Sequence, residues 1–290
     1  MFNKRFTRLE KLLFLLIGLF LFIDAALILY PHVYERVYLN RDRISKEIMR
    51  SKLAVFLDNF YWKNTLGIEP ISGKPEWWKK VAVNQTHPGL LKTVQTAFNK
   101  YGYRNATPYS MCSESAIAMN INYLRLAEGL PPVDMDEIIH LVTSERWLYS
   151  DGSLPVAGQE RLIEHYGYDV FGHPAEEIGF RGYYLKSFEI DYFLSIGYPV
   201  LIYVKIDENG LSRVKNGDVN HAILVIGKDD SEDYWILDPL PVNRKTSHHA
   251  VAPQKVSAET LYSSWFIEDE KGMGYLIHKR TNVYEVNFGF

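Results

Sequence analysis

The only cysteine of this 290-residue chain, Cys112, stands where a polar loop is expected to lead into a helix. The partial positive charge of a helix N-terminus favours a thiolate over a thiol. Far downstream, His221 opens one expected strand and Asp238 closes the next. A thiol, an imidazole and a carboxylate can serve as nucleophile, general base and orienting group. The three residues therefore predict a Cys–His–Asp catalytic site.

Each of these residues also has a purely structural explanation. A lone cysteine is most often a buried core residue, and an Asp-Pro pair often ends a strand in a turn. The chain has nine histidines, so the presence of a histidine together with the cysteine is not evidence of catalysis. The surroundings favour catalysis. Serine and glutamate follow Cys112, loop-forming residues precede His221, and five apolar residues follow it. A hairpin of the strands that carry His221 and Asp238 would align the start of one with the end of the other, which brings the two residues together.

The elements that must position these residues follow from hydrophobic spacing. The pattern predicts helices over 90–101, 112–127, 135–144, 159–166, 187–195 and 258–265. It predicts strands over 169–171, 200–205, 221–227, 234–238, 274–278 and 282–288. Because the helices come mainly first and the strands mainly second and antiparallel, the expected fold class is α+β.

Composition excludes several classes of function. Hydrophobic residues make up 47% and charged residues 23% of the chain, as in ordinary folded proteins. The net charge of -3 gives no basic field for a nucleic-acid partner. One cysteine excludes an internal disulfide framework and a multi-cysteine zinc site. We expect no cofactor and no metal; His248 and His249 are better explained as solvated loop residues than as ligands.

The N-terminus carries a targeting signal. Residues 12–30 are apolar apart from Gly18 and Asp24, and four basic residues precede them. At ~1.5 Å per residue, this stretch can cross the roughly 30 Å hydrocarbon core of a bilayer. It contains no convincing cleavage pattern. We expect a single-pass anchor over 1–31, a membrane-proximal helix and linker over 32–88, and a catalytic domain over 89–290. The basic flank favours a cytoplasmic N-terminus and an extracytoplasmic C-terminal domain.

Four ordered motifs, with a helix after them, resemble those of the C39-like cysteine peptidases of the papain superfamily. They are C-x-x-x-[SA]-x-x-M at 112–119, G-x-P-V at 197–200, H-A followed by four hydrophobic residues and glycine at 221–227, and Asp-Pro at 238–239. The later stretch 257–265 is similar to the family's S-x-x-x-F-x-x-x-W helix, with Leu261 in the aromatic position. The resemblance covers 103–278. It implies a papain-like fold, with N-terminal helices packed on an antiparallel sheet, and a peptide or protein substrate. The expected transmembrane helix precedes this domain.

The chain departs from that family beside the cysteine. The family has a glutamine shortly before the cysteine that helps to bind the oxyanion, whereas 104–111 contain none. Asn105 is the nearest substitute, since Gln95 lies too far back on a helix. Ser113 replaces the customary glycine. Glu114 is interpreted as a first-turn residue favoured by the helix dipole, with a polar role in the site as the alternative.

These departures leave other functions open. One oxyanion donor is worth ~10²–10³ in rate, so a catalytically weak or inactive C39-like binding domain is one alternative. A transglutaminase-type acyltransferase is another, because its residue order is also Cys, His, Asp. Related domains process peptides beside ABC exporters. This chain has no nucleotide-binding loop, so such a transporter would be a separate membrane partner.

Overall fold

The computed structural model describes residues 71, 77–107, 110–208, 210–215, 218–240, 251–268 and 270–280. They belong to one compact unit, Pro70–Arg280, which includes part of the segment that the sequence assigned to the linker. The expected membrane span, the pair His248 and His249, and the expected strand 282–288 lie outside the described residues. Within the described ranges, no helix is both long and apolar enough to cross a membrane.

The helices agree closely with the hydrophobic spacing. They are α4 (Trp78–Val81), α5 (Pro88–Tyr101), α6 (Cys112–Ala127), α7 (Met135–Ser144), α8 (Val156–His165), the 3-10 helix η3 (Ala175–Ile178), α9 (Ser187–Ser195) and α10 (Ala258–Trp265). The bounds predicted for α6, α7, α9 and α10 are confirmed, and those of α5 and α8 differ by up to three residues.

The strands form one main antiparallel sheet. They are β1 (Tyr168–Phe171), β2 (His173–Pro174), β3 (Tyr183–Lys186), β4 (Val200–Val204), β5 (Ile206–Asp207), β6 (Gly210–Leu211), β7 (His221–Lys228), β8 (Tyr234–Leu237), β9 (Gln254–Val256), β10 (Phe266–Glu268) and β11 (Lys271–Lys279). The order in the main sheet is β2-β3-β11-β4-β7-β8-β9, with β1 and β10 also paired to β11; β5 and β6 form a separate small sheet. The α+β class is confirmed.

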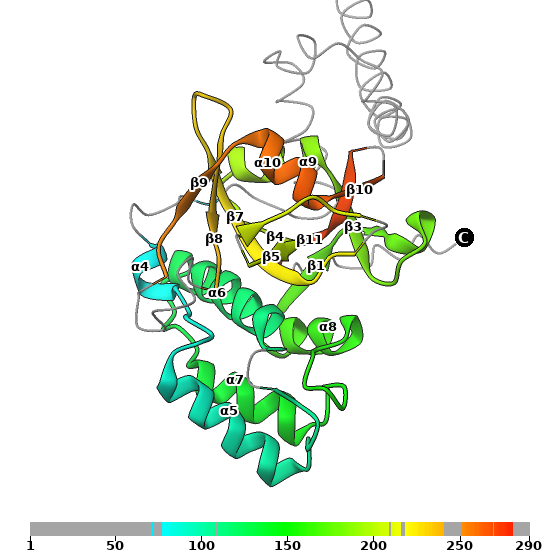
Figure 1. Ribbon diagram of the computed structural model, residues 1–290. Coiled ribbons are helices and arrows are strands. Elements are labelled where there is room, and N and C mark those ends of the chain that lie inside the picture. Colours follow the sequence, from blue (N-terminus) through cyan, green and yellow to red (C-terminus); the bar gives the residue numbers. More distant parts are fainter. Residues whose placement is uncertain are drawn as a thin grey trace, which may run out of the picture. The chain divides into compact units, whose positions relative to one another are not determined.

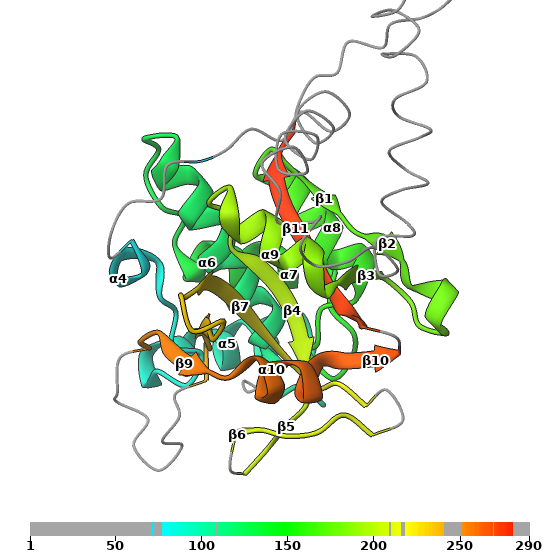
Figure 2. The same ribbon diagram turned by 90° about the horizontal axis from the view of Figure 1, so that it is seen from above.

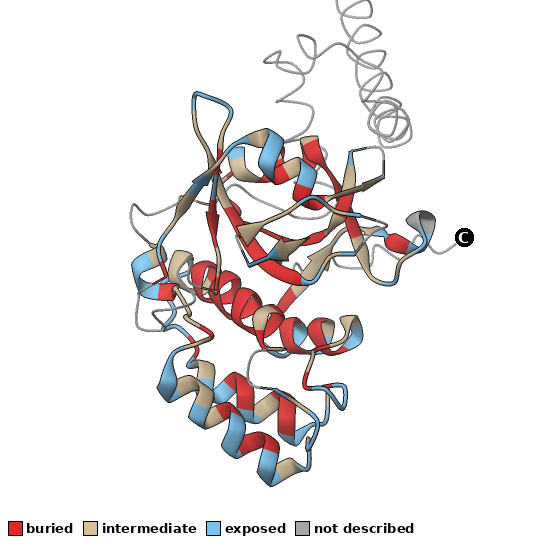
Figure 3. Ribbon diagram, in the orientation of Figure 1, coloured by how far each residue is buried: buried red, intermediate tan, exposed pale blue. Residues whose placement is uncertain are grey.

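Helices cover both faces of the main sheet (Figures 1 and 2). Helix α6 crosses one face, with α5 and α7 beyond it, and α9 and α10 lie on the other face. Because α6 packs between the sheet and other helices, it is buried along most of its length (Figure 3). Ile117 and Ile121 on this helix are 0% exposed. The buried helix holds its first residue, Cys112, against the sheet.

Helix α10 is hydrogen-bonded to the segment after β4, which leads along the chain to His221. Ser257 caps the helix, since its hydroxyl accepts a hydrogen bond from the Thr260 amide. Leu261 and Trp265 are fully buried one turn apart, which explains the spacing of the serine–tryptophan motif. The carbonyl of Ser264 accepts from the amide of Lys205, just after β4, at 2.8 Å.

Candidate active site

Cys112 is the first residue of α6, and it is partly buried. No side chain of a described residue caps this helix end, and the N–H groups of its first turn, which have no partner within the helix, present partial positive charge to the sulfur. The backbone N–H of Ala222 on β7 also acts to lower the pKa of the thiol. Helix start and sheet therefore both favour negative charge at this position.

His221 and Asp238 meet through the register of the β7–β8 hairpin. Leu224 pairs with Leu237, so Asp238, one residue beyond β8, continues the register opposite Ile223. Side chains two residues apart on a strand share a face, which places Asp238 diagonally across from His221. The distance between His221 Nε2 and Asp238 Oδ1 is 2.6 Å. The side chain of His221 is 3% exposed and that of Asp238 15%.

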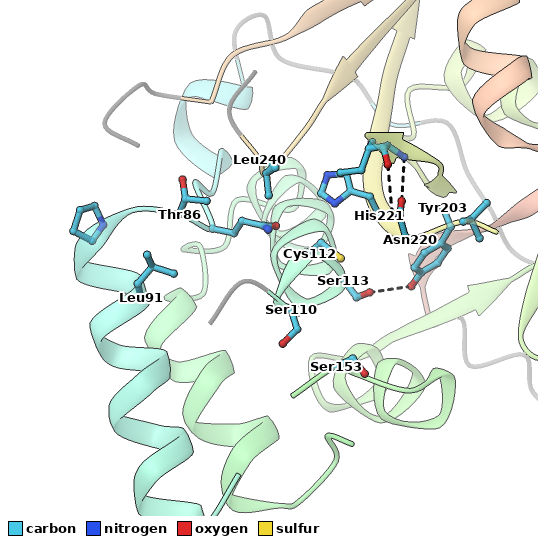
Figure 4. A pocket seen from close by; sticks show the side chains of 14 residues that line it. Thr86, Leu91, Ser110, Cys112, Ser113, Ser153, Tyr203, Asn220, His221 and Leu240 are labelled. Atoms are coloured by element: carbon cyan, nitrogen blue, oxygen red, sulfur yellow. Dashed lines mark hydrogen bonds between the residues drawn. The ribbon is translucent and has the colours of Figure 1, made fainter. Parts of the chain in front are cut away.

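The thiol of Cys112 and the imidazole of His221 lie close together at the cavity wall (Figure 4), and each alters the ionisation of the other. Burial acts against a charged Cys112, but the hydrogen bond and positive charge of His221, with the Ala222 amide and the Ser113 hydroxyl, outweigh it and lower the pKa of the thiol. Burial also acts against a charged His221, yet its bonds to Asp238 and Cys112 raise its pKa to about 9. The arrangement favours a thiolate–imidazolium pair.

These groups open onto a cavity of about 850 Å³ (Figure 4). Cys112, Ser113, Tyr203 and His221 lie close together at one part of its wall. The described lining residues are Gln85, Thr86, Pro88, Leu91, Ser110, Cys112, Ser113, Ser153, Tyr203, Ile206, Val219, Asn220, His221 and Leu240. Apart from the cysteine, the histidine and the tyrosine, this lining carries no ionisable side chain, so the described wall offers aliphatic and neutral polar contacts.

The structure places Asn105 elsewhere. Asn105 is exposed and lines a separate hollow with Arg146 and Leu148, and it is not among the described residues that line the cysteine cavity. The other glutamine weighed from the sequence, Gln95, bonds to Asn99 on the exposed side of α5. Neither side chain is placed as an oxyanion donor beside Cys112.

Gln85 is the cavity residue that sequence reasoning missed. It is 1% exposed and lines the same cavity as Cys112 and His221. Its backbone N–H donates to the carbonyl of Pro239 at 3.0 Å, which ties it to the residue after Asp238. The whole of α5 separates Gln85 from Cys112 in the chain. Spacing alone gave no signal, because the family that the sequence resembles has its glutamine only several residues before the cysteine.

Glu114 differs from its expected role. An exposed, charged carboxylate would benefit from the helix dipole, but Glu114 is 0% exposed. Neither carboxyl oxygen has a hydrogen-bond partner among the described residues. Burial, with a smaller contribution from the nearby Cys112, raises the pKa of this carboxyl well above its ordinary value. Glu114 is therefore in the first turn of α6, as expected, but it is buried, and its burial disfavours the charged form that the helix dipole would stabilise.

Other candidate features have a clear place. Ser153 lines the cavity, and its hydroxyl donates to Asp151 Oδ1 at 2.7 Å. Gly152 has a φ of +86°, and a Cβ there would lie 2.7 Å from the Cβ of Ala106, so glycine is required. In the described part of the chain, no three histidine, cysteine or acidic residues gather as metal ligands.

Comparison with known proteins finds only remote structural similarity. No protein-family model matches the chain, and no curated protein matches it. The peptidase domain of Streptococcus ComA, a bi-functional ABC transporter involved in a quorum-sensing pathway, aligns at 14% identity and a TM-score of 0.36, over 59% of this chain and 93% of that one. A double glycine motif protease from an AMS/PCAT transporter, in complex with the leader peptide, aligns at 13% identity and a TM-score of 0.31, over 58% and 84%. Likeness at this level carries no functional conclusion.

Proposed function

We propose that this protein is a cysteine peptidase of C39-like, papain-superfamily type, with Cys112, His221 and Asp238 as its catalytic residues. One observation carries the proposal: a thiol at a helix start shares a cavity wall with a buried histidine, and that histidine is paired at 2.6 Å with a carboxylate. The order of the four sequence motifs supports a peptide substrate. A membrane anchor over residues 12–30 and an extracytoplasmic domain belong to the same proposal.

The reaction follows from these charges. The Cys112 thiolate attacks the peptide carbonyl carbon, a C–S bond forms, and the carbonyl electron pair moves to oxygen. When the intermediate collapses, the C–N bond breaks and the His221 imidazolium gives its proton to the leaving nitrogen. Water then attacks the thioester and gives a proton to His221, and the C–S bond breaks to regenerate thiolate and imidazolium. Asp238 keeps the imidazole oriented and stabilises its charged form.

Gln85 is the oxyanion donor in this proposal. Its burial, its place in the cavity wall and its tie to Pro239 support the assignment. A fixed amide N–H beside a developing oxyanion stabilises the transition state without having to reorganise. We expect Gln85→Ala to lower kcat by ~10²–10³, whereas Asn105→Ala leaves it unchanged.

The test uses the full-length chain purified in detergent. Because Cys112 is the only cysteine, alkylation by iodoacetamide reports on this thiol alone. At pH 6 a free thiol is almost entirely protonated, so we expect Cys112 to react faster than free cysteine and His221→Ala to abolish the advantage. A quenched-fluorescence peptide library then measures hydrolysis, with Cys112→Ala as the blank.

The results separate the competing functions. Alkylation no faster than free cysteine, unaffected by His221→Ala, would remove the catalytic assignment. Fast alkylation without cleavage of any peptide would favour a binding domain. Transfer of the acyl group to added dansylcadaverine in preference to water would identify an acyltransferase.

A further inference from the structure

A hollow near the cysteine cavity is lined by two arginines, Arg104 and Arg146, and has a volume of about 510 Å³. Tyr101, Tyr103 and Ser150 add hydroxyl groups to its wall. Both arginines are exposed, and neither forms an ion pair with a described residue. No acidic side chain is among the described residues that line the hollow. We call this feature the arginine hollow; its wall carries two positive charges that no neighbour in the described structure neutralises.

The backbone at Arg146 is unusual. Helix α7 ends in a tight turn in which the N–H of Trp147 donates to the carbonyl of Val142 at 3.0 Å, and Arg146 inside this turn has a φ of +58°. This left-handed conformation favours glycine, because a Cβ crowds the following carbonyl oxygen. Helices α5, α6, α8 and α9 are each followed within two residues by a glycine of positive φ, namely Gly102, Gly129, Gly167 and Gly197. Helix α7 has an arginine at the equivalent point.

The attraction of a helix C-terminus for cations does not explain this arginine. For an exposed side chain that attraction is weaker than the cost of a left-handed residue other than glycine. Helix α7 has no basic residue in its last turn, and its C-cap is Glu145, whose charge has the unfavourable sign at a helix C-terminus. Backbone strain kept at a residue whose side chain lines a hollow indicates that the side chain is used there.

The chemistry of the arginine hollow suits a carboxylate. A guanidinium group can donate two parallel hydrogen bonds to the two oxygens of one carboxylate, and hydroxyl groups can donate further bonds. The cysteine cavity differs, because its described lining has no acidic, lysine or arginine side chain. Of the two spaces, the arginine hollow is therefore the one equipped to distinguish a charged peptide side chain from a neutral one.

A short turn separates the two spaces. Ser150 lines the arginine hollow, and Ser153 lines the cysteine cavity. The turn is closed by a bond from the Tyr149 N–H to the Ser153 carbonyl at 2.9 Å, and Ser110 in the cavity wall bonds to the Asp151 carbonyl at 3.3 Å. Three steps of ~3.8 Å place the Cα atoms of Ser150 and Ser153 within about 11 Å of each other. An extended peptide covers this distance with three or four residues, at ~3.3 Å per residue.

We propose that the arginine hollow binds an acidic side chain of the same peptide whose scissile bond lies at Cys112, about three to six residues from that bond. The proposal rests on the function proposed above and names a class of substrate for it. Arg104 and Arg146 determine specificity in this proposal. They touch no reacting atom, so their contribution is to substrate binding and hence to KM.

The test compares a peptide that the full-length chain cleaves in two forms, with glutamate or glutamine at each of the six positions on either side of the scissile bond. We expect glutamate to lower KM at one position or at two neighbouring positions. Arg104→Gln and Arg146→Gly should each reduce this preference by about three- to fivefold, the size of an exposed ion pair. Arg161→Gln is the matched control, because it removes an exposed charge from α8 that lines neither space.

Arg146→Gly also separates binding from folding. Glycine adopts a positive φ without strain, so the urea midpoint of this variant should equal or exceed that of the wild type while the preference for glutamate is lost. A structural arginine would give a lower midpoint instead. Arg146→Lys keeps the charge without the planar fork and should retain part of the preference.

A binding measurement makes the result independent of hydrolysis. The anisotropy of fluorescein-labelled tetraglutamate and tetraglutamine is followed with full-length Cys112→Ala at low salt. We expect the arginine hollow to bind tetraglutamate more tightly, with a preference that weakens as salt is added and in both arginine variants. Tetraglutamate should also compete with the glutamate form of the substrate more strongly than with the glutamine form.

The outcomes distinguish the arginine hollow from the peptidase assignment. Loss of the glutamate preference in both arginine variants, but not in Arg161→Gln, supports the proposal. A preference that survives in both variants, or equal losses for the two peptide forms, overturns it. Tetraglutamate bound through the arginines without any glutamate preference in hydrolysis overturns it too, since the site would then serve a separate anionic partner. Absence of all cleavage with that binding intact would refute the peptidase assignment, and the substrate role with it.

Discussion

Two regions of this molecule contain nearly the same pair of side chains. At the cavity, His221 Nε2 lies 2.6 Å from Asp238 Oδ1. Toward the other edge of the sheet, His173 Nε2 on β2 lies 2.7 Å from Glu189 Oε1 on α9. Both histidines are largely buried: the side chain of His221 is 3% exposed and that of His173 is 20% exposed.

The surroundings give the two pairs different roles. Glu189 also accepts from the backbone N–H of Lys186 at 2.7 Å, so its second oxygen closes the start of α9. Its partner His173 packs against the ring of Tyr184. His221 instead faces the chain's only thiol, at a cavity. A histidine–carboxylate pair is thus a structural connection by default, and it becomes a candidate for catalysis only where a nucleophile and space for a substrate adjoin it.

Replacing each histidine in turn is the strongest test of the different roles of the two pairs. We expect His221→Ala to lower peptide hydrolysis by about 10⁴-fold or more, the size of effect found when a base is removed from such a site. His173→Ala should lower the free energy of unfolding by about 1–2 kcal/mol and leave hydrolysis by the folded protein unchanged. Rates per folded molecule and urea denaturation measure the two effects. Equal losses of activity would show that the two pairs do not differ as described.

Replacing the carboxylates tests the same contrast at a smaller scale. Asp238→Asn retains the shape but cannot stabilise an imidazolium or fix its tautomer, so hydrolysis should fall by about 10²–10⁴-fold. Glu189→Gln should cost about 1–3 kcal/mol of stability, because a buried acceptor is weakened, with kcat retained. A Glu189→Gln variant that folds normally yet loses hydrolysis would contradict the purely structural role of this pair.

The pH dependence sharpens the difference further. The thiolate is lost as pH falls through the lowered pKa of Cys112, and the imidazolium is lost as pH rises through about 9. Hydrolysis should therefore hold a plateau between these limits and decline above about pH 9. In Asp238→Asn the pKa of His221 loses its main upward cause, so the alkaline limb moves toward neutral pH, whereas Glu189→Gln leaves both limbs in place. An alkaline limb that stays fixed in Asp238→Asn would show that Asp238 does not control the charge of His221.

The sequence predicted the long elements of this fold well. The helix from Cys112 has apolar residues at helical spacing after a polar start, and the strand from His221 is a continuous apolar run preceded by loop-forming residues. The start of each element could therefore be predicted. Strands β2, β5 and β6 are two residues long. Such segments are too short to show a period, and their pairing depends on neighbours that are distant in the chain.

The site residues also divide into those that the sequence could predict and those that it could not. Residues at the ends of regular elements, such as Cys112, His221 and Asp238, could be singled out because the element marks them. Gln85 lies in a loop whose position depends on its bond to Pro239, a contact that no local pattern encodes. The burial of Glu114 could not be predicted either, because helix-start statistics describe exposed ends and this one is covered by the sheet.

The bond between Gln85 and Pro239 has a consequence for how this protein can vary. Gln85 and Cys112 both line the cavity, and Gln85 is held there by its bond to Pro239, so the chain between them, with most of α5, is a long loop that begins and ends at the cavity. The free-energy cost of lengthening such a loop grows only with the logarithm of its length. Insertions and deletions within this loop can therefore accumulate while the cavity stays assembled. The distance in sequence between a glutamine and its cysteine is then a poor guide to whether the two act together.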